Sequence, residues 1–164
     1  MNIALIGMMG SGKSTIGKLL AEKLNLNFID TDEEIVKITN SSINQIFEQQ
    51  GEDSFREIET TVLKKVLNKK EQVVSTGGGI IKKEENRNLL KDITTIYLQA
   101  EDTTLFERVK NDNTRPLLNT KNLLNTIQTI LNERKSLYEQ ANFIIDTTDK
   151  SPQEVVNEIM EKIK

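Results

Sequence analysis

A glycine-rich turn between a short apolar run and an amphipathic stretch constrains the fold of this chain more than any other feature. The turn, Gly7-Met8-Met9-Gly10-Ser11-Gly12-Lys13-Ser14, satisfies the pattern G-x-x-x-x-G-K-[ST]. Residues 3–6 before it are apolar, and apolar residues recur after it at helical spacing from Ile16 to Leu24. A strand, a loop and a helix in this order predict a phosphate-binding loop.

The residue types of this turn indicate what it binds. Glycines allow backbone N–H groups to approach a phosphate closely, and the N-terminus of the following helix adds partial positive charge. Lys13 is then expected to reach the β- and γ-phosphates of a nucleotide, and the Ser14 hydroxyl to bind the bridging Mg²⁺. The alternative, an ordinary glycine-rich turn at the start of a helix, is disfavoured because both flanking elements are present.

Composition narrows the possible chemistry. The chain has 164 residues and alternates short apolar runs with amphipathic segments, which predicts a single α/β domain. It contains neither Cys nor His, which excludes disulfides, thiolate zinc sites and imidazole acid–base chemistry. A general base must therefore be Asp, Glu, Lys or Tyr.

Charge and hydropathy limit the partners. The net charge of −3, from 22 basic and 25 acidic residues, offers no basic field for nucleic acid. No apolar run approaches the roughly 20 residues of a membrane-spanning helix, and the sequence passes from Met1 directly into the first strand without a signal peptide. We therefore expect a cytoplasmic monomer that binds small molecules, with no nucleic acid and no membrane partner.

Two carboxylates, Asp30 and Asp32, follow the second expected strand, residues 26–29. Ligands of open α/β sheets collect at the carboxyl ends of the strands, so both should face the same crevice as the phosphate-binding loop. One of the two could instead cap the next helix, expected over residues 33–39.

Arg56 is expected in the first turn of a helix that a capping box at Ser54 and Glu57 opens. A cation in that turn opposes the helix dipole, so an anion is needed to offset it. An ion pair with Asp53 or Glu59 and a role in ligand binding are equally open from the sequence. A shorter helix precedes this one and is expected to end near Gly51.

Glycines also follow the third expected strand, residues 72–75, as Thr76-Gly77-Gly78-Gly79. Three consecutive glycines allow backbone groups to lie close to a ligand, although a flexible turn is the plain alternative. Many proteins with a phosphate-binding loop end this strand in a metal-associated Asp. None follows Val74 here, so Asp30 is the best carboxylate for the metal.

Two further arginines suggest anion binding. Arg115 lies in a polar loop directly before Pro116, which favours an extended backbone that could fold over a phosphoryl group. A solvated loop arginine is the alternative. Arg134 interrupts the apolar stripe of a helix expected over residues 123–138, so its guanidinium points inward. A buried guanidinium needs an internal carboxylate or an anionic ligand.

Six motifs taken together resemble the shikimate kinase family over nearly the whole chain: GMMGSGKST, the D-x-D pair, FREIE from Phe55, TGGG from Thr76, RPLL from Arg115 and ERKSLYEQA from Glu133. The resemblance implies ATP-dependent phosphorylation of the 3-hydroxyl of shikimate, on the pathway to chorismate and aromatic amino acids. It also implies a single kinase domain over residues 1–164, similar to nucleoside monophosphate kinases. The expected fold is a five-stranded parallel sheet in the order 2-3-1-4-5, flanked by helices, with a mobile lid at about 111–122.

The resemblance further implies the roles of individual residues. ATP would be bound by Gly10, Ser11, Gly12, Lys13, Ser14, Thr15, Arg108, Arg115 and Pro152, with Arg108 and Pro152 on either side of the adenine. Shikimate would be bound by Asp32, Arg56, Gly77, Gly78, Gly79 and Arg134, with the two arginines on its carboxylate. Mg²⁺ would be held by Ser14 and Asp30, and the catalytic residues would be Lys13, Asp32 and Arg115.

Two other functions remain possible on the sequence. A gluconate- or nucleotide-type kinase could share this architecture, and a gluconate kinase would also use an arginine for a carboxylate. A nucleotide-binding relative without catalytic activity is the other alternative, since a fold does not guarantee activity. Such a relative is expected to have lost Lys13, Asp32 or an arginine, and all of these are present.

Overall fold

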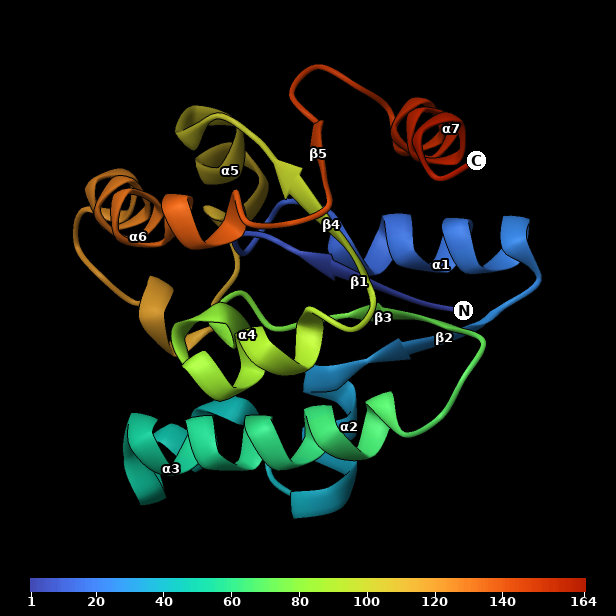
Figure 1. Ribbon diagram of the computed structural model, residues 1–164. Helices are drawn as coiled ribbons and strands as arrows, with labels where there is room; N and C mark the ends of the chain where they lie inside the picture. Colours follow the sequence, from blue (N-terminus) through green and yellow to red (C-terminus); the bar gives the residue numbers. More distant parts are fainter.

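The computed structural model describes residues 1–164 and places five parallel strands in the order β2-β3-β1-β4-β5 (Figure 1). The strands are β1 (Asn2–Ile6), β2 (Asn27–Asp30), β3 (Gln72–Ser75), β4 (Thr94–Gln99) and β5 (Phe143–Asp146). In the central register, Leu5 lies opposite Ser75 on one side and Ile96 on the other. The expected strand order is confirmed, and the strands expected at residues 3–6, 26–29 and 72–75 are present with ends within one residue.

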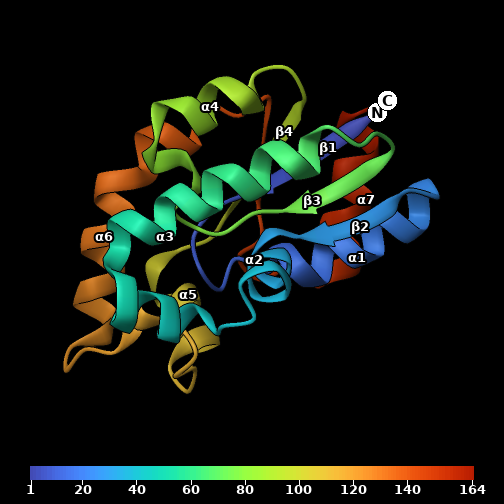
Figure 2. The same cartoon turned by 90° about the horizontal axis from the view of Figure 1, so that it is seen from below.

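Helices cover both faces of this sheet. They are α1 (Lys13–Leu24), α2 (Thr31–Thr39), α3 (Ile43–Leu67), α4 (Glu84–Leu90), α5 (Asp102–Val109), α6 (Leu123–Tyr138) and α7 (Pro152–Lys162), with short 3-10 helices at Ile80–Lys82 and Pro116–Leu118. Figure 2 shows α1 and α7 on one face and α3, α4 and α6 on the other. None of the helices combines the length and apolarity needed to cross a membrane.

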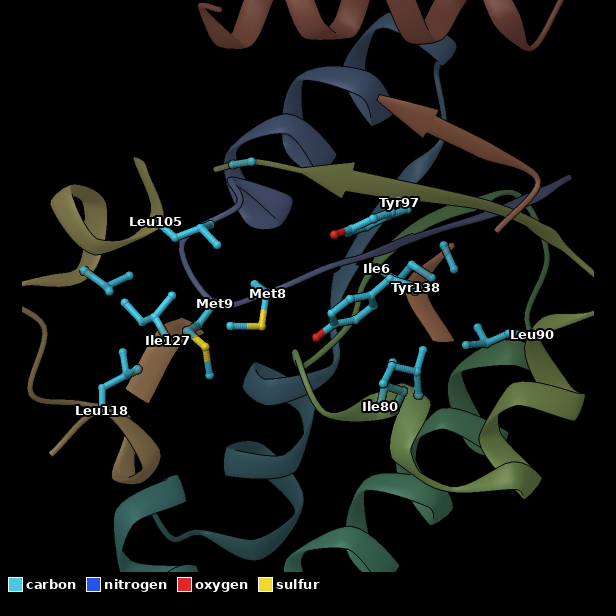
Figure 3. Packing of buried hydrophobic residues seen from close by; sticks show 14 of the residues in the cluster. Ile6, Met8, Met9, Ile80, Leu90, Tyr97, Leu105, Leu118, Ile127 and Tyr138 are labelled. Atoms are coloured by element: carbon cyan, nitrogen blue, oxygen red, sulfur yellow. The ribbon is translucent and has the colours of Figure 1, made fainter. Parts of the chain in front are cut away.

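Three apolar clusters hold these layers together, and one of them reaches the phosphate-binding loop. Leu20 of α1 and Ile159 of α7 pack with the strands on the first face. On the other face, Met8 and Met9 of the loop are buried in the same cluster as Tyr97 and Tyr138 (Figure 3). The two tyrosine rings stack with centroids 5.0 Å apart. Burial of the two methionines fixes the loop at the end of β1.

The boundaries of α2 and α3 differ from those expected. Helix α2 begins at Thr31, two residues early, because the Asp30 side chain caps it by accepting from the backbone N–H groups of Asp32 and Glu33. The helices on either side of Gly51 form one element, α3, which is kinked where Gly51 adopts φ 83° and ψ 173°. This kink is where the first of the two was expected to end.

The expected capping box at Ser54 and Glu57 is wrong. Ser54 lies inside α3, and its hydroxyl donates to the side chain of Gln50 at 2.9 Å across the kink. Ser54 is three residues past the kink at Gly51, within the helix that continues from it. The capping box of this helix lies at its true start, between Ser42 and Gln45.

Candidate active site

The carboxyl ends of β1, β2 and β3 border two adjoining hollows. The first, the phosphate hollow, has no hydrophobic lining and is formed by Gly10, Gly12, Lys13, Ser14, Thr15, Asp30, Asp32, Ser75, Thr76, Gly77, Gly78, Arg108 and Arg115. The second, the acceptor hollow, combines apolar side chains with Asp32, Arg56, Glu59 and Arg134. Asp32, Gly77, Gly78 and Arg115 line both hollows, so the two expected sites meet at these four residues.

Lys13 lies inside the turn of the phosphate-binding loop. Its Nζ donates to the carbonyl oxygens of Gly7 and Met8, each at 2.8 Å, and the residue is only 7% exposed. Burial, followed by the positive charge of Arg115, lowers the pKa of Lys13 to about 7, although Asp32 opposes the shift. The protein therefore holds this cation where a phosphate would favour its charged form.

Glycine is required at Gly10 and Gly12 of the loop. Their φ angles are 80° and 93°, values that residues with a side chain rarely adopt. A Cβ on Gly10 would also lie 2.6 Å from a methyl carbon of Val109. Gly12 directly precedes α1, so the loop presents the N-terminus of a 12-residue helix to the phosphate hollow.

Three oxygen-bearing side chains meet beside the loop. Ser14 Oγ donates to Asp30 Oδ2 at 2.6 Å and lies 3.3 Å from Ser75 Oγ. Asp30 therefore contacts Ser14 and caps α2 at the same time, so the two interpretations of this residue do not compete. Hard oxygen donors of this kind suit Mg²⁺, which usually keeps several waters and needs few protein ligands.

Asp32 lies between the two hollows on the first turn of α2. Its Oδ1 is buried without a hydrogen-bond partner. Burial, and then the negative charge of Asp30, raises the pKa of Asp32, against the effect of Lys13 and the nearby arginines. A carboxylate with an open acceptor and a raised pKa is suited to receive a hydrogen bond or a proton from a hydroxyl.

Arg56 is buried in the acceptor hollow and is paired with two carboxylates of its own helix. Its guanidinium lies 2.9 Å from Glu59 and 3.2 Å from Glu52. Of the two partners considered from the sequence, Glu59 is found, whereas Asp53 is replaced by Glu52, which is one helical turn before Arg56. Glu59 is fully buried, and this burial raises its pKa although Arg56 opposes the shift.

Arg134 is the second buried arginine and has no carboxylate partner. It is 5% exposed, lies within salt-bridge distance of no Asp or Glu, and its Nη1 is buried without a hydrogen-bond partner. Nη1 lies 3.6 Å from the position that a Cβ on Gly78 would occupy. The sequence left two kinds of partner open for Arg134, an internal carboxylate or an anionic ligand. The structure contains no such carboxylate.

The triple-glycine segment runs between these arginines. Gly77 N–H donates to the buried Thr31 hydroxyl at 3.1 Å, and the Tyr138 hydroxyl donates to the Gly78 carbonyl. A Cβ on Gly79 would lie 2.4 to 2.5 Å from the guanidinium of Arg56. The segment is therefore fixed rather than a flexible turn, and its lack of side chains lets Arg56 lie against the backbone.

The remaining expected residues lie at the edges of the phosphate hollow. Arg115 has an extended backbone, as Pro116 predicts, and is bonded to Asp112. Arg108 donates to the carbonyl oxygens of Gly10 and Thr147, both at 3.1 Å. Arg108 and Pro152 line a further hollow beside the loop, which also includes Ser11, Gly12 and Thr15.

Several lining residues were not proposed from the sequence. Ser75 at the end of β3 and Glu59 on α3 lie in the site. The acceptor hollow is further lined by Val36, Ile43, Phe47, Phe55 and Leu117. The position of Ser75, two residues before Gly77, could have indicated it, but the apolar residues look like ordinary core positions in the sequence.

Comparisons with known proteins point to one family over nearly the whole chain. The family model described as Shikimate kinase matches residues 9–164. A shikimate kinase of Persephonella marina is 46% identical, with 99% of each chain covered, and one of Thermodesulfovibrio yellowstonii is 44% identical, with 98% of this chain and 94% of that protein covered.

Solved structures give the same result. A shikimate kinase from Acinetobacter baumannii in complex with shikimate superposes with a TM-score of 0.97 at 37% identity, covering 99% of this chain and 92% of that one. A gluconokinase from Sinorhizobium meliloti, at 18% identity and a TM-score of 0.59, shares the fold alone. The chain belongs to the shikimate kinase family.

Proposed function

We propose that this chain transfers the γ-phosphoryl group of ATP to the 3-hydroxyl of shikimate, with Mg²⁺, in the pathway to chorismate and aromatic amino acids. The observation that carries the proposal is Arg134, a buried guanidinium with no carboxylate partner and with Nη1 unbonded, in a hollow that also holds Arg56 and Asp32. Two arginines and a carboxylate match a substrate that carries one carboxylate and several hydroxyls.

The phosphate hollow binds the nucleotide. The loop N–H groups and Lys13 hold the β- and γ-phosphates, with Gly10, Ser11, Gly12 and Thr15 forming the rest of the loop contact. Ser14 and Asp30 would hold Mg²⁺, with Ser75 beside them; the metal neutralises charge on the phosphates when bound. Arg108 and Pro152 enclose the adenine, in the hollow beside the loop that both residues line.

The acceptor hollow orients shikimate. Arg134 and Arg56 bind its carboxylate, while Gly77, Gly78 and Gly79 place backbone groups against the ring. Asp32 orients the 3-hydroxyl and receives its proton as the phosphoryl group is transferred. Arg115, which borders both hollows, stabilises the charge that spreads over the transferring group. Phosphoryl transfer depends mainly on such positioning and charge neutralisation.

We further propose one kinase domain over residues 1–164, with a lid at about 111–122 that closes when both substrates are bound. The lid lies next to α3 and contributes Arg115, Pro116 and Leu117 to the acceptor hollow. We also propose that the protein acts in the cytoplasm, as a monomer, on these two small and charged substrates.

A coupled assay of ADP release with shikimate, gluconate and nucleoside monophosphates as acceptors tests this function. Shikimate should be turned over with a kcat/KM at least about 100-fold above the others, because only it pairs with both arginines and Asp32. Faster turnover of gluconate or of a nucleotide would assign another kinase activity. ATP binding without turnover of any acceptor would identify a non-catalytic relative.

A further inference from the structure

The lid holds Arg115 through an ion pair inside its own turn. Arg115 Nε donates to Asp112 Oδ2 at 2.9 Å. The other oxygen of the same carboxylate, Oδ1, accepts from the backbone N–H of Thr114 at 2.8 Å and from its hydroxyl at 2.6 Å. One side chain thus makes three hydrogen bonds and closes the turn from residue 112 to residue 115.

The environment of Asp112 favours its ionised form and fixes its position. Burial alone would raise the pKa of Asp112, but the hydrogen bonds from Thr114 and the charge of Arg115 outweigh burial and lower the pKa. The side chain of Asp112 is 26% exposed, and the turn is tied to the start of α3 because Asn44 donates to the carbonyl oxygen of Asn113 at 3.4 Å.

With the ion pair formed, Arg115 lies at the border of both hollows. Its positive charge contributes to lowering the pKa of Lys13 and opposes the rise at Asp32, so it acts on both halves of the site. Within the protein, the side chain of Arg115 donates a hydrogen bond through Nε alone. The two terminal nitrogens, Nη1 and Nη2, therefore remain as donors for a ligand.

We propose that Asp112 is a positioning residue for phosphoryl transfer, which fixes the Nε edge of Arg115 so that Nη1 and Nη2 meet the transferring phosphoryl group. The inference rests on the role proposed above for Arg115. A partly exposed ion pair adds little to stability, so its effect falls on the orientation of the arginine in the transition state. The opposite arrangement, in which Asp112 holds Arg115 away from the phosphates, predicts faster turnover once Asp112 is removed.

The variant Asp112→Asn keeps an oxygen acceptor for Thr114 and removes the charge that holds Nε. Turnover of shikimate should fall about two- to tenfold in kcat, the effect expected when one long side chain loses its order. The KM values of ATP and shikimate and the melting temperature should stay close to those of the unmodified protein. Asp112→Glu, which restores the charge, should recover part of the loss.

Glu107→Gln serves as the matched control. Glu107 pairs with Lys110 at 2.6 Å with the same spacing of three residues, on the last turn of α5 just before the lid. It touches neither hollow, so its loss should leave kcat unchanged.

The decisive step repeats Asp112→Asn in an Arg115→Ala background, where it should cause no further loss. An equal loss in both backgrounds, or an unchanged or higher kcat in Asp112→Asn alone, would overturn the proposal. If Arg115→Ala itself leaves kcat unchanged, both the role proposed for Arg115 and the positioning role proposed for Asp112 are refuted. A large loss in Arg115→Ala beside no loss in Asp112→Asn refutes only the inference.

Discussion

Arg134 and Arg56 are both buried in the acceptor hollow, but only Arg56 has carboxylate partners. Arg134→Lys keeps a positive charge and loses the planar two-pronged donor. We expect the KM of shikimate to rise about tenfold to a hundredfold, the worth of a charge-assisted hydrogen bond. The KM of ATP and the melting temperature should change little. A large drop in melting temperature with an unchanged KM of shikimate would assign Arg134 to the core.

Arg56→Ala provides the contrast at the same site. It leaves the fully buried Glu59 without its partner, so unfolding should become easier by about 3–5 kcal/mol. Glu59→Gln in addition should restore part of that stability, because a neutral amide tolerates burial better than a carboxylate. Chemical denaturation of Arg134→Lys, of Arg56→Ala and of the double variant Arg56→Ala with Glu59→Gln measures these differences in the free energy of unfolding. Equal stability losses at both arginines would contradict the distinction.

Lys13 should make nucleotide binding depend on pH. Its pKa of about 7 must rise when phosphate groups lie beside it, so above pH 7 binding takes up a proton. Titration calorimetry of ADP binding at pH 8, in buffers of different ionisation enthalpy, should show this uptake, and at pH 6 it should vanish. In Lys13→Arg, whose charge does not titrate, no uptake is expected. Binding to the unmodified protein at pH 8 without proton uptake would refute the lowered pKa.

The same shift has a consequence for the free protein. The unfolded chain keeps Lys13 protonated up to its ordinary pKa, so between about pH 7 and about pH 10 the unfolded state binds more protons. This residue therefore makes the free protein more stable as the pH rises through that window. The direction is opposite to that of nucleotide affinity, which falls with rising pH.

At the scale of elements, the glycine segment between β3 and the following 3-10 helix forms the wall against which Arg56 lies. A Cβ on Gly79 would fall within 2.5 Å of a guanidinium that two carboxylates hold in place. Gly79→Ala should therefore raise the KM of shikimate about tenfold or more while ADP affinity changes less than about twofold, since a displaced Arg56 loses its charge-assisted bond.

Gly78→Ala is the comparison, because its Cβ would meet nothing nearer than 3.3 Å. A smaller rise in the KM of shikimate is expected there. Equal effects at the two glycines would show that backbone freedom, rather than contact with Arg56, explains the segment.

Element boundaries could be predicted where the local sequence pattern fits one arrangement, and the prediction failed where the pattern fits more than one. Strand β3 lies where the sequence places it. The start of α2 was missed because the sequence left open which of Asp30 and Asp32 caps the helix, and the structure shows that Asp30 does. The capping box at Ser54 was wrong because Ser54 lies inside α3, three residues after the kink at Gly51.

At the scale of the whole molecule, the loop, strand and helix pattern was sufficient for the α/β class, and the family resemblance supplied the strand order. Inward placement of Arg134 followed from periodicity alone. Its lack of a carboxylate did not, because that depends on what α3 and the glycine segment bring beside it. Ser75 was missed, and Glu59 was expected only as an ion-pair partner of Arg56, because the packing of β3 and α3 is what brings both side chains into the site.

The central claim is that two hollows, one for nucleotide and one for shikimate, meet at Asp32. The most direct test measures kcat for shikimate and the Kd of ATP on one preparation of Asp32→Asn. Because the amide keeps the shape but cannot accept the hydroxyl proton, kcat should fall at least about 100-fold while the Kd of ATP stays within about threefold. A collapse of ATP affinity with shikimate turnover largely preserved would contradict the account.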